Sequence, residues 1–196
     1  MNDSQIRSAF HTTVLQDAHL CDETVVFNEL GLKNGECRAD IAVLNGKMIG
    51  YEIKTAKDNL TRLASQVISY SKIFDKAFII VAENHFEKVQ NIIPDWWGIY
   101  LITATKENYT FTRYRKGKIN PSLDAFSIAQ LLWKEEALEV ATKILNCTIR
   151  SNATRQDIYE IISLKCKSKE LSKIVMQYLK KREGWRKDTS QKNMFN

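Results

Sequence analysis

Residues 38–54 read RADIAVLNGKMIGYEIK, and this stretch decides the fold. Its large apolar side chains fall at odd positions, namely Ile41, Val43, Ile49, Tyr51 and Ile53. Alternation of this kind, in residues that are β-branched or aromatic, predicts two strands that share one buried face. Asn45-Gly46-Lys47, which lies between them, predicts the turn of a β-hairpin.

Burial selects the register of this hairpin. A tight two-residue turn at Asn45-Gly46 would place the apolar residues of the first strand on the opposite face from those of the second. An odd-length loop, with Gly46 in the left-handed conformation of a G1 bulge, keeps all five on one face. The same register gathers three charged side chains on the other face: Asp40, Glu52 and Lys54.

Two carboxylates and a lysine on one sheet face suit phosphodiester hydrolysis with a divalent metal ion. Mg²⁺ polarises a phosphoryl group, lowers the pKa of a bound water and keeps several waters, so few protein ligands suffice. Asp40 and Glu52 are the predicted side-chain ligands, and the carbonyl of Ile53 is a third. Lys54 is predicted to orient the attacking water or to meet the developing charge on the phosphate. The expected cofactor is Mg²⁺, with Mn²⁺ as a substitute.

Helices and further strands are expected around the hairpin. By periodicity and turn signals they are a helix at 3–18, a strand at 24–30 broken by Gly31 and the Asn34-Gly35 pair, a helix from Asp58 or Asn59 to about 74, a strand at 77–82, a helix at 85–93 and strands at 98–103 and 109–115, joined by a turn at 106–108. Residues 77–82 are wholly apolar, which predicts a central strand buried on both faces. A right-handed crossover places this strand parallel to the one that carries Glu52.

Strand signals end at 117–121, where we place a boundary. The predicted helices beyond it cover 127–145, 154–164 and 168–182, the last capped by Ser168. From Arg150 onward there are 12 basic and 5 acidic residues, so the net charge of +6 belongs to this segment. Such an excess can neutralise phosphates, although a solvated helical surface has the same composition. We therefore predict an α/β domain at 1–118 and a basic helical extension at 119–196.

Composition excludes several classes of protein. The 196 residues include two prolines and seven glycines, which is typical of a globular chain. The longest apolar run, Ala77–Ala82, is too short to span a bilayer, and the first ten residues lack the apolar core of a secretory signal. The four cysteines show no C-x-x-C spacing, which indicates reduced thiols. We expect a cytoplasmic protein with no membrane partner.

A strand with Asp, a hairpin, Glu-Ile-Lys, a helix and an apolar strand together resemble the PD-(D/E)XK nuclease superfamily. The Pro-Asp position is Ala39-Asp40 in this chain, so the proline is absent. Gln66–Tyr70 resembles the Gln-x-x-x-Tyr motif of the RecB-type branch. With 94–98, which read PDWWG, the pattern is similar to MmcB-like DNA-repair proteins and, more closely, to an uncharacterised bacterial and phage family. Leu131-Leu132-Trp133 and the Arg-x-x-Trp at 182–185 also resemble that family.

The resemblance implies a restriction-endonuclease-like mixed sheet with an αβββαβ core, flanked by helices. It implies a metal-dependent nuclease, with DNA as the expected substrate, in repair or in phage or mobile-element biology. Relatives often recruit one more acidic residue, for which Glu29 is the candidate and Glu36 the runner-up. Gln66 and Tyr70 would position Lys54 or the phosphate. Many relatives act as dimers, so a homodimer is an option.

Basic residues around these motifs are candidate nucleic-acid contacts. Arg62 lies four residues before Gln66, so the two share a helix face. The other candidates are Arg38, Lys57, Arg113 and Arg115. Arg113 and Arg115 fit equally well as charges that protect an edge strand.

The sequence supports three hypotheses about function. The first is the metal-dependent DNA nuclease. The second is a catalytically silent module of the same fold that binds DNA or a protein. The third is a nuclease that cuts RNA, because nothing in the sequence separates RNA from DNA as the substrate.

Overall fold

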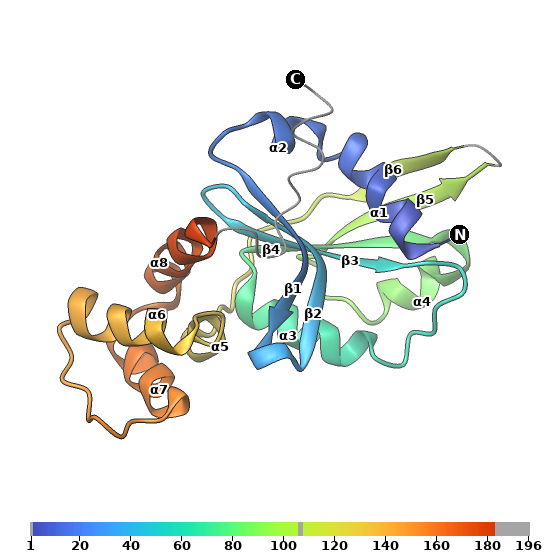
Figure 1. The fold of residues 1–196 in the computed structure, drawn as a ribbon. Coiled ribbons are helices and arrows are strands. Elements are labelled where there is room, and N and C mark those ends of the chain that lie inside the picture. Colours follow the sequence, from blue (N-terminus) through green and yellow to red (C-terminus); the bar gives the residue numbers. More distant parts are fainter. Residues whose placement is uncertain (1, 106–107, 183–196) are drawn as a thin grey trace.

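The computed structural model describes residues 2–105 and 108–182, and a mixed six-stranded sheet forms the centre of this part (Figure 1). The strands, in spatial as well as chain order, are β1 (Val25–Leu32), β2 (Cys37–Leu44), β3 (Met48–Lys54), β4 (Lys76–Ala82), β5 (Gly98–Ala104) and β6 (Tyr109–Arg115). The pairs β3–β4 and β4–β5 are parallel and the others antiparallel. The α/β class and the parallel placement of 77–82 are confirmed.

The hairpin has the register that burial requires. Leu44 pairs with Met48 and Ile41 with Tyr51, so the loop contains three residues. Gly46 has a φ of +62°, and the Asn45 amide donates to the Lys47 carbonyl over 3.1 Å. The predicted odd-length loop with a left-handed Gly46 is therefore confirmed.

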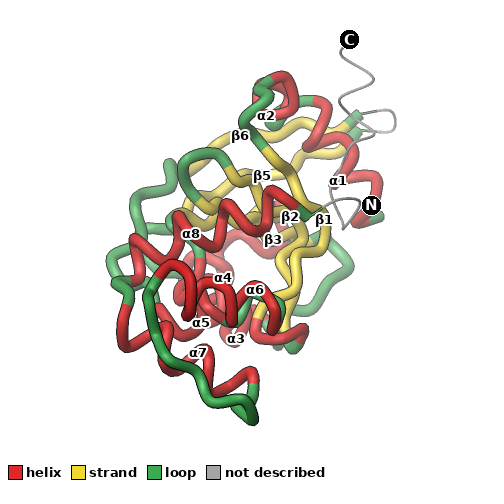
Figure 2. The backbone as a smooth tube through the Cα atoms, turned by 60° about the vertical axis from the view of Figure 1, so that its left-hand side comes forward, coloured by secondary structure: helices red, strands yellow, loops and turns green. Residues whose placement is uncertain are grey.

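Helices cover both faces of the sheet. Their bounds are α1 (Asp3–Thr12), α2 (Gln16–Leu20), α3 (Leu63–Ile73), α4 (Phe86–Gln90), α5 (Ala125–Ala129), α6 (Lys134–Glu139), α7 (Arg155–Lys165) and α8 (Ser168–Lys181), with 3-10 turns at Lys33–Gly35 and Glu83–His85 and a π-helical turn at Val140–Ile144. Figures 1 and 2 show α5 to α8 gathered on one side of the molecule, away from α1 and α2. No helix among the described residues is long and apolar enough to cross a membrane.

Each face of the sheet has its own hydrophobic core. The core on the α1 side contains Ile6, Phe10, Leu15, Val26, Ile41, Val43, Tyr51, Ile53, Phe78, Ile80 and Ile102. The core on the α3 side is larger, and among its members are Phe27, Leu30, Ala42, Leu44, Tyr70, Ile79, Trp97, Ile128, Tyr159, Val175 and Leu179. The odd positions of the hairpin thus face α1, as predicted. The even positions Ala42, Leu44 and Met48 are buried as well, beneath α3.

Strand β1 changes sides at Glu29, which has a φ of +55°. Phe27 and Leu30 are three positions apart, yet both lie in the core on the α3 side. The left-handed residue between them resets the alternation of the strand. The strand then continues through Gly31 to Leu32, so the predicted break at Gly31 is wrong. The chain turns at Lys33–Gly35, so the break predicted at Asn34-Gly35 is confirmed.

Side-chain hydrogen bonds, which periodicity does not reveal, accompany several shifted helix ends. The predicted helix at 3–18 is divided into α1 and α2, and the turn between them brings His19 Nε2 within 2.9 Å of His11 Nδ1. Helix α3 begins at Leu63 because the side chains of Asp58 and Asn59 accept from nearer amides, at Thr55 (2.6 Å) and Thr61 (3.3 Å).

The predicted helix at 127–145 is also wrong, since the structure divides it into α5, α6 and the π-helical turn. Between α5 and α6 the Leu132 carbonyl accepts a hydrogen bond from the hydroxyl of Tyr159 over 2.5 Å. The predicted helix at 154–164 is present as α7, and Thr154 caps it by accepting from the Asp157 amide. Ser168 does not cap α8, because its hydroxyl donates to the Leu123 carbonyl.

The helical extension shares the core on the α3 side with the sheet. Trp97 is fully buried there, 5.3 Å from the ring of Tyr70, so it packs the core instead of stacking on bases. The boundary at 118/119 stays a prediction. Residues 106–107 of the predicted turn and 183–185 of the Arg-x-x-Trp motif lie outside the described residues.

Candidate metal and nucleic-acid site

Glu52 is the centre of the site. It lies near the end of β3, and its carboxylate is almost fully buried. Lys54 Nζ and Gln66 Nε2 donate to Oε1 over 2.6 and 2.5 Å, and the hydroxyl of Tyr70 donates to Oε2 over 2.6 Å. The structure therefore brings four of the predicted site residues together around one carboxylate. The donors come from β3 itself and from one face of α3.

Tyr70 acts in this arrangement as a hydrogen-bond donor. Burial, and then the negative charge of Glu52, raise the pKa of its phenol well above the ordinary value. The hydroxyl also lies 3.2 Å from the Tyr51 carbonyl. A phenol that stays protonated fixes the orientation of Glu52 and takes no part in acid–base exchange near neutral pH.

Asp40 lies beside Glu52 at the point where β2 and β3 stop pairing. The last pair in the ladder is Ile41 with Tyr51, and the Asp40 carboxylate then accepts from the Ile53 amide over 2.7 Å. Burial, and then the charge of Glu52, raise the pKa of Asp40 to about 8. Without an added cation the two carboxylates repel each other, and Asp40 holds a proton at neutral pH.

The residues present fit a magnesium ion. Asp40, Glu52 and Ile53 all line one cleft, so two carboxylates and a backbone carbonyl are available. Mg²⁺ prefers such oxygen ligands and completes its shell with water. The buried amide oxygen of Gln66 accepts no hydrogen bond from the described residues, which suits a water held beside the ion. No group of three or more His, Cys, Asp or Glu side chains within the described ranges is arranged to hold a metal.

Glu29 is not brought into a carboxylate cluster with Asp40 and Glu52. Its carboxylate pairs with Arg7 Nη1 at 3.3 Å and with Arg38 Nη1 at 3.4 Å. The side chain is 44% exposed and does not line the cleft. Its proposed role as a metal ligand therefore rests on the family resemblance, and the geometry gives it arginine partners instead.

Arg7 is a site residue that sequence reasoning missed. Its guanidinium lies 2.7 Å from Asp3, 3.3 Å from Glu29 and 4.0 Å from Asp40. Helix α1 thus places a cation among three acids, two of which, Glu29 and Asp40, are predicted metal ligands. The spacing of Asp3 and Arg7 is a visible helical pair, but nothing in the sequence links that pair to a strand more than twenty residues away.

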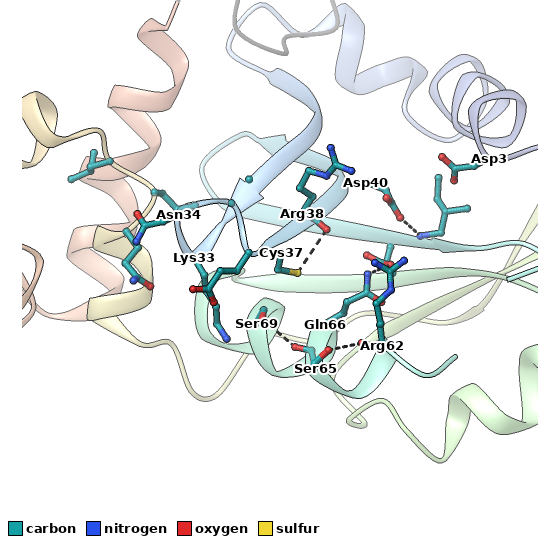
Figure 3. A pocket seen from close by; sticks show the side chains of 18 of the residues that line it. Asp3, Lys33, Asn34, Cys37, Arg38, Asp40, Arg62, Ser65, Gln66 and Ser69 are labelled. Atoms are coloured by element: carbon teal, nitrogen blue, oxygen red, sulfur yellow. Dashed lines mark hydrogen bonds between the residues drawn. The ribbon is translucent and has the colours of Figure 1, made fainter. Parts of the chain in front are cut away.

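The cleft has a volume of about 850 Å³ (Figure 3). Two of the predicted nucleic-acid contacts, Arg62 and Arg38, line the cleft. Figure 3 shows both side chains: Arg62 directly precedes α3, and Arg38 lies on β2. Lys57 and Arg113 are exposed but lie outside it. Arg115 donates to the Trp97 and Pro94 carbonyls over 2.7 and 3.0 Å, so it joins β6 to the loop that precedes β5.

Comparison with known proteins assigns the chain to a phage family. A profile of the family described as bacteriophage P4 protein cII matches residues 2–194. The chain belongs to the bacteriophage P4 cII family. Protein cII of Enterobacteria phage P4 is 24% identical over 182 residues, which cover 93% of this chain and 68% of the relative. No solved structure matches the chain.

Family membership confirms the phage part of the expected relationship. The match spans the sheet, the site and the helical extension, so all of these parts belong to one family unit. The relative's name states no reaction, substrate or partner. The function is therefore argued from the geometry of the site.

Proposed function

We propose that this chain is a metal-dependent nuclease with a restriction-endonuclease-like core that hydrolyses phosphodiester bonds of DNA in the cytoplasm of a bacterial host. The observation that carries the proposal is the arrangement of Lys54, Gln66 and Tyr70 around the buried Glu52, beside Asp40. The chain order α1-α2-β1-β2-β3-α3-β4, with β3 and β4 parallel, supports the proposed core. The phage family supports a role in phage or mobile-element biology, with DNA repair as the related setting.

A buried carboxylate with three donors is hard to explain as a purely structural feature. Burying a charged group costs several kcal/mol unless it is paired and hydrogen-bonded. Sheets of this size need no such group at the end of a central strand. The donors hold Glu52 in one orientation, which is what a metal ligand requires. Asp40 remains 24% exposed toward the cleft, where an ion can replace its proton.

Each residue of the site has a defined task in the proposed reaction. Mg²⁺, when bound, supplies a Lewis acid and a water of lowered pKa. Asp40, Glu52 and the Ile53 carbonyl would hold the ion. Gln66 and Tyr70 keep the Glu52 carboxylate in place. The Lys54 side chain is 9% exposed and lines the cleft, so its ammonium can bind a scissile phosphate and stabilise its added negative charge.

A second candidate is the silent module of the same fold, which binds DNA or a protein without cutting. The observation that favours it is the position of Arg7, whose positive charge lies beside Asp3, Glu29 and Asp40, where the charge of a metal ion would otherwise act. A site that already contains a cation has less need of a divalent ion. The basic side chains in the cleft suit both candidates.

A cleavage assay separates the candidates. The purified chain is incubated with plasmid, linear and branched DNA and with RNA, in Mg²⁺, in Mn²⁺ and in EDTA. We expect metal-dependent cleavage of DNA that is lost in Asp40→Ala and Lys54→Ala and kept in Lys88→Ala, which removes an exposed charge outside the cleft. Cleavage of RNA but not of DNA would show that the substrate is RNA. DNA binding without cleavage, indifferent to metal, would favour the silent module.

A further inference from the structure

The cleft that contains Asp40 and Glu52 continues to the helical extension. Its far part is lined by Trp133, Arg155 and Arg182 of the extension and by the Lys33–Gly35 turn between β1 and β2. Figure 3 shows Asp3 and Asp40 toward one end of this cleft and Asn34 at the other. The residues of the far part take no part in holding Glu52, so this part has a separate use.

Cations line the cleft along its length, whereas the carboxylates that would hold a metal lie at one end. Asp3, Asp40 and Glu52 lie at the sheet end, together with the cations Lys54, Arg38 and Arg62. Toward the extension, Lys33 and the exposed Arg155 supply positive charge, with Glu36 as an acid on the turn. An anion that spans the cleft would meet a metal at one end and cations at the other. A polynucleotide carries its phosphates at regular intervals and fits that distribution.

Trp133 gives the far part an aromatic surface that is held in place. The residue is 46% exposed, which is unusual for a tryptophan. Its backbone amide donates to Glu136 Oε2 over 2.7 Å, and the guanidinium of Arg182 lies 4.1 Å from the ring centre. Arg182 is itself buried and donates to Glu136 Oε1 and to the Leu131 carbonyl, each over 2.8 Å. The ring is therefore ordered before any ligand arrives.

An ordered aromatic ring beside cations favours unpaired nucleotides over a duplex. Bases inside a duplex are covered on both faces by their neighbours, whereas an unpaired base can stack on an aromatic side chain. The volume of the cleft, about 850 Å³, is of the size of pockets that hold small ligands. A few splayed nucleotides match that size better than the width of a double helix.

We propose that Trp133 and Arg155, with Lys33 on the opposite wall, form a subsite for an unpaired stretch of nucleic acid that leads into the metal site. Trp133 stacks on a base, and Arg155 and Lys33 contact phosphates. The inference deepens the proposed function and rests on it for the direction of the strand. It assigns to the helical extension the selection of single-stranded or frayed substrates.

The test measures binding of the full chain in EDTA, so that cleavage does not interfere. The probe is a short fluorescein-labelled oligothymidylate, compared by anisotropy with a blunt duplex and with oligouridylate. We expect Trp133→Ala to weaken oligothymidylate binding roughly tenfold or more, while Trp133→Phe keeps most of the affinity and duplex binding changes little. Arg155→Ala should weaken binding and lower the salt dependence by about one phosphate contact.

Two variants serve as matched controls. Tyr178→Ala removes another aromatic ring of the extension that lies below a cation, Lys181, but outside the cleft. Lys169→Ala removes an exposed charge of α8 outside the cleft. Both should bind oligothymidylate like the wild type. If they weaken binding as much as the Trp133 and Arg155 variants do, the subsite is wrong.

The outcomes for the subsite and for the reaction are distinguishable. Unchanged oligothymidylate affinity in Trp133→Ala and Arg155→Ala would overturn the subsite, even if DNA is cleaved. Should Trp133→Ala fail to fold, unchanged affinity in Arg155→Ala alone would overturn it. Weakened binding together with no cleavage of any substrate would support the subsite and contradict the proposed nuclease activity. Equal losses of affinity for oligothymidylate and oligouridylate would show that the subsite binds any unpaired strand.

Discussion

At the scale of one residue, the hydroxyl of Tyr70 is expected to support both the stability of the fold and the binding of a metal ion. Tyr70→Phe removes the donor to Glu52 Oε2 but keeps the ring against Trp97. Because a buried carboxylate then loses one partner, we expect the free energy of unfolding to fall by about 1–3 kcal/mol. We also expect Mn²⁺ to raise the melting temperature of the variant less than that of the wild type. Chemical denaturation and thermal scans measure the two effects.

Tyr159→Phe is the matched control. Its hydroxyl is also buried, and it donates to the Leu132 carbonyl far from the two carboxylates. We expect a similar loss of stability in this variant with an unchanged response to Mn²⁺. Equal responses to Mn²⁺ in all three proteins would remove Tyr70 from the site.

Asp40 predicts a dependence of stability on pH. The pKa of its carboxyl is 3.8 ordinarily and about 8 in the folded, metal-free chain. Between these values the folded chain holds a proton that the unfolded chain has lost, so the free energy of unfolding decreases as pH rises through this window and levels off above about 8. Mn²⁺ must displace this proton, so its stabilising effect should grow over the same window.

Denaturation in EDTA at several pH values between 5 and 9 tests this prediction. Asp40→Asn lacks the titrating group and should lose the part of the decrease that Asp40 supplies. A wild-type profile that matches the Asp40→Asn profile would show that Asp40 is ionised in the folded chain throughout. The repulsion between Asp40 and Glu52 would then be smaller than the geometry indicates.

At the scale of elements, the packing of α3 on β3 positions the site. A Cβ added to Gly50 on β3 would lie 2.6 Å from ring carbons of Phe74, at the end of α3. Because Phe74 is fully buried, Gly50→Ala should push α3 away from the sheet and cost about 1–3 kcal/mol. It should also reduce cleavage, since Gln66 and Tyr70 move with α3. Denaturation and initial cleavage rates report the two effects.

Gly31→Ala is the control for this prediction. It also adds a methyl group to a strand, but the nearest atom to the new Cβ, at 3.9 Å, is in ordinary contact. We expect it to change stability and cleavage much less. If Gly50→Ala behaved like Gly31→Ala, the contact between Phe74 and β3 would not position the helix.

The elements that sequence predicts well are those in which burial alternates locally. The hairpin register followed from five apolar residues and one turn, and it placed Glu52 and Lys54 together. The start of α3 did not follow, because Asp58 and Asn59 bond to amides two or three residues away instead of capping the helix. The division of 127–145 did not follow, because Tyr159, the partner of Leu132, lies far away in the chain. Arg7 was missed for the same reason. Neither its contact with Asp40 nor the far wall of the cleft leaves a pattern in a single segment.

At the scale of the whole molecule, Asn120 joins the sheet to the helical extension. It lies in the predicted boundary at 117–121, yet it is buried, and its amide group donates to the Ser71 and Phe74 carbonyls over 2.7 and 2.8 Å. Asn120→Ala leaves both carbonyls without this partner, so we expect a loss of about 2 kcal/mol or more in the free energy of unfolding. Asn152→Ala, at an exposed position, should change it little.

The shared core predicts that sheet and extension unfold together. Residues on both sides of the boundary pack into the core on the α3 side. Tryptophan fluorescence and far-ultraviolet circular dichroism should therefore give coincident denaturation curves for the wild type. Two separated transitions would instead support independent domains at 1–118 and 119–196.

We propose that Asp40 and Glu52 hold a metal ion with which the chain cleaves DNA. This is tested by the Mn²⁺-dependent cleavage rate of DNA by the wild type beside Asp40→Asn, a variant of nearly the same shape whose amide oxygen can still accept from the Ile53 amide. We expect cleavage by the wild type, none in EDTA, and a rate at least about a hundredfold lower in the variant. Equal rates in the two proteins, or no metal-dependent cleavage by the wild type, would show that Asp40 and Glu52 are not the metal site of a nuclease.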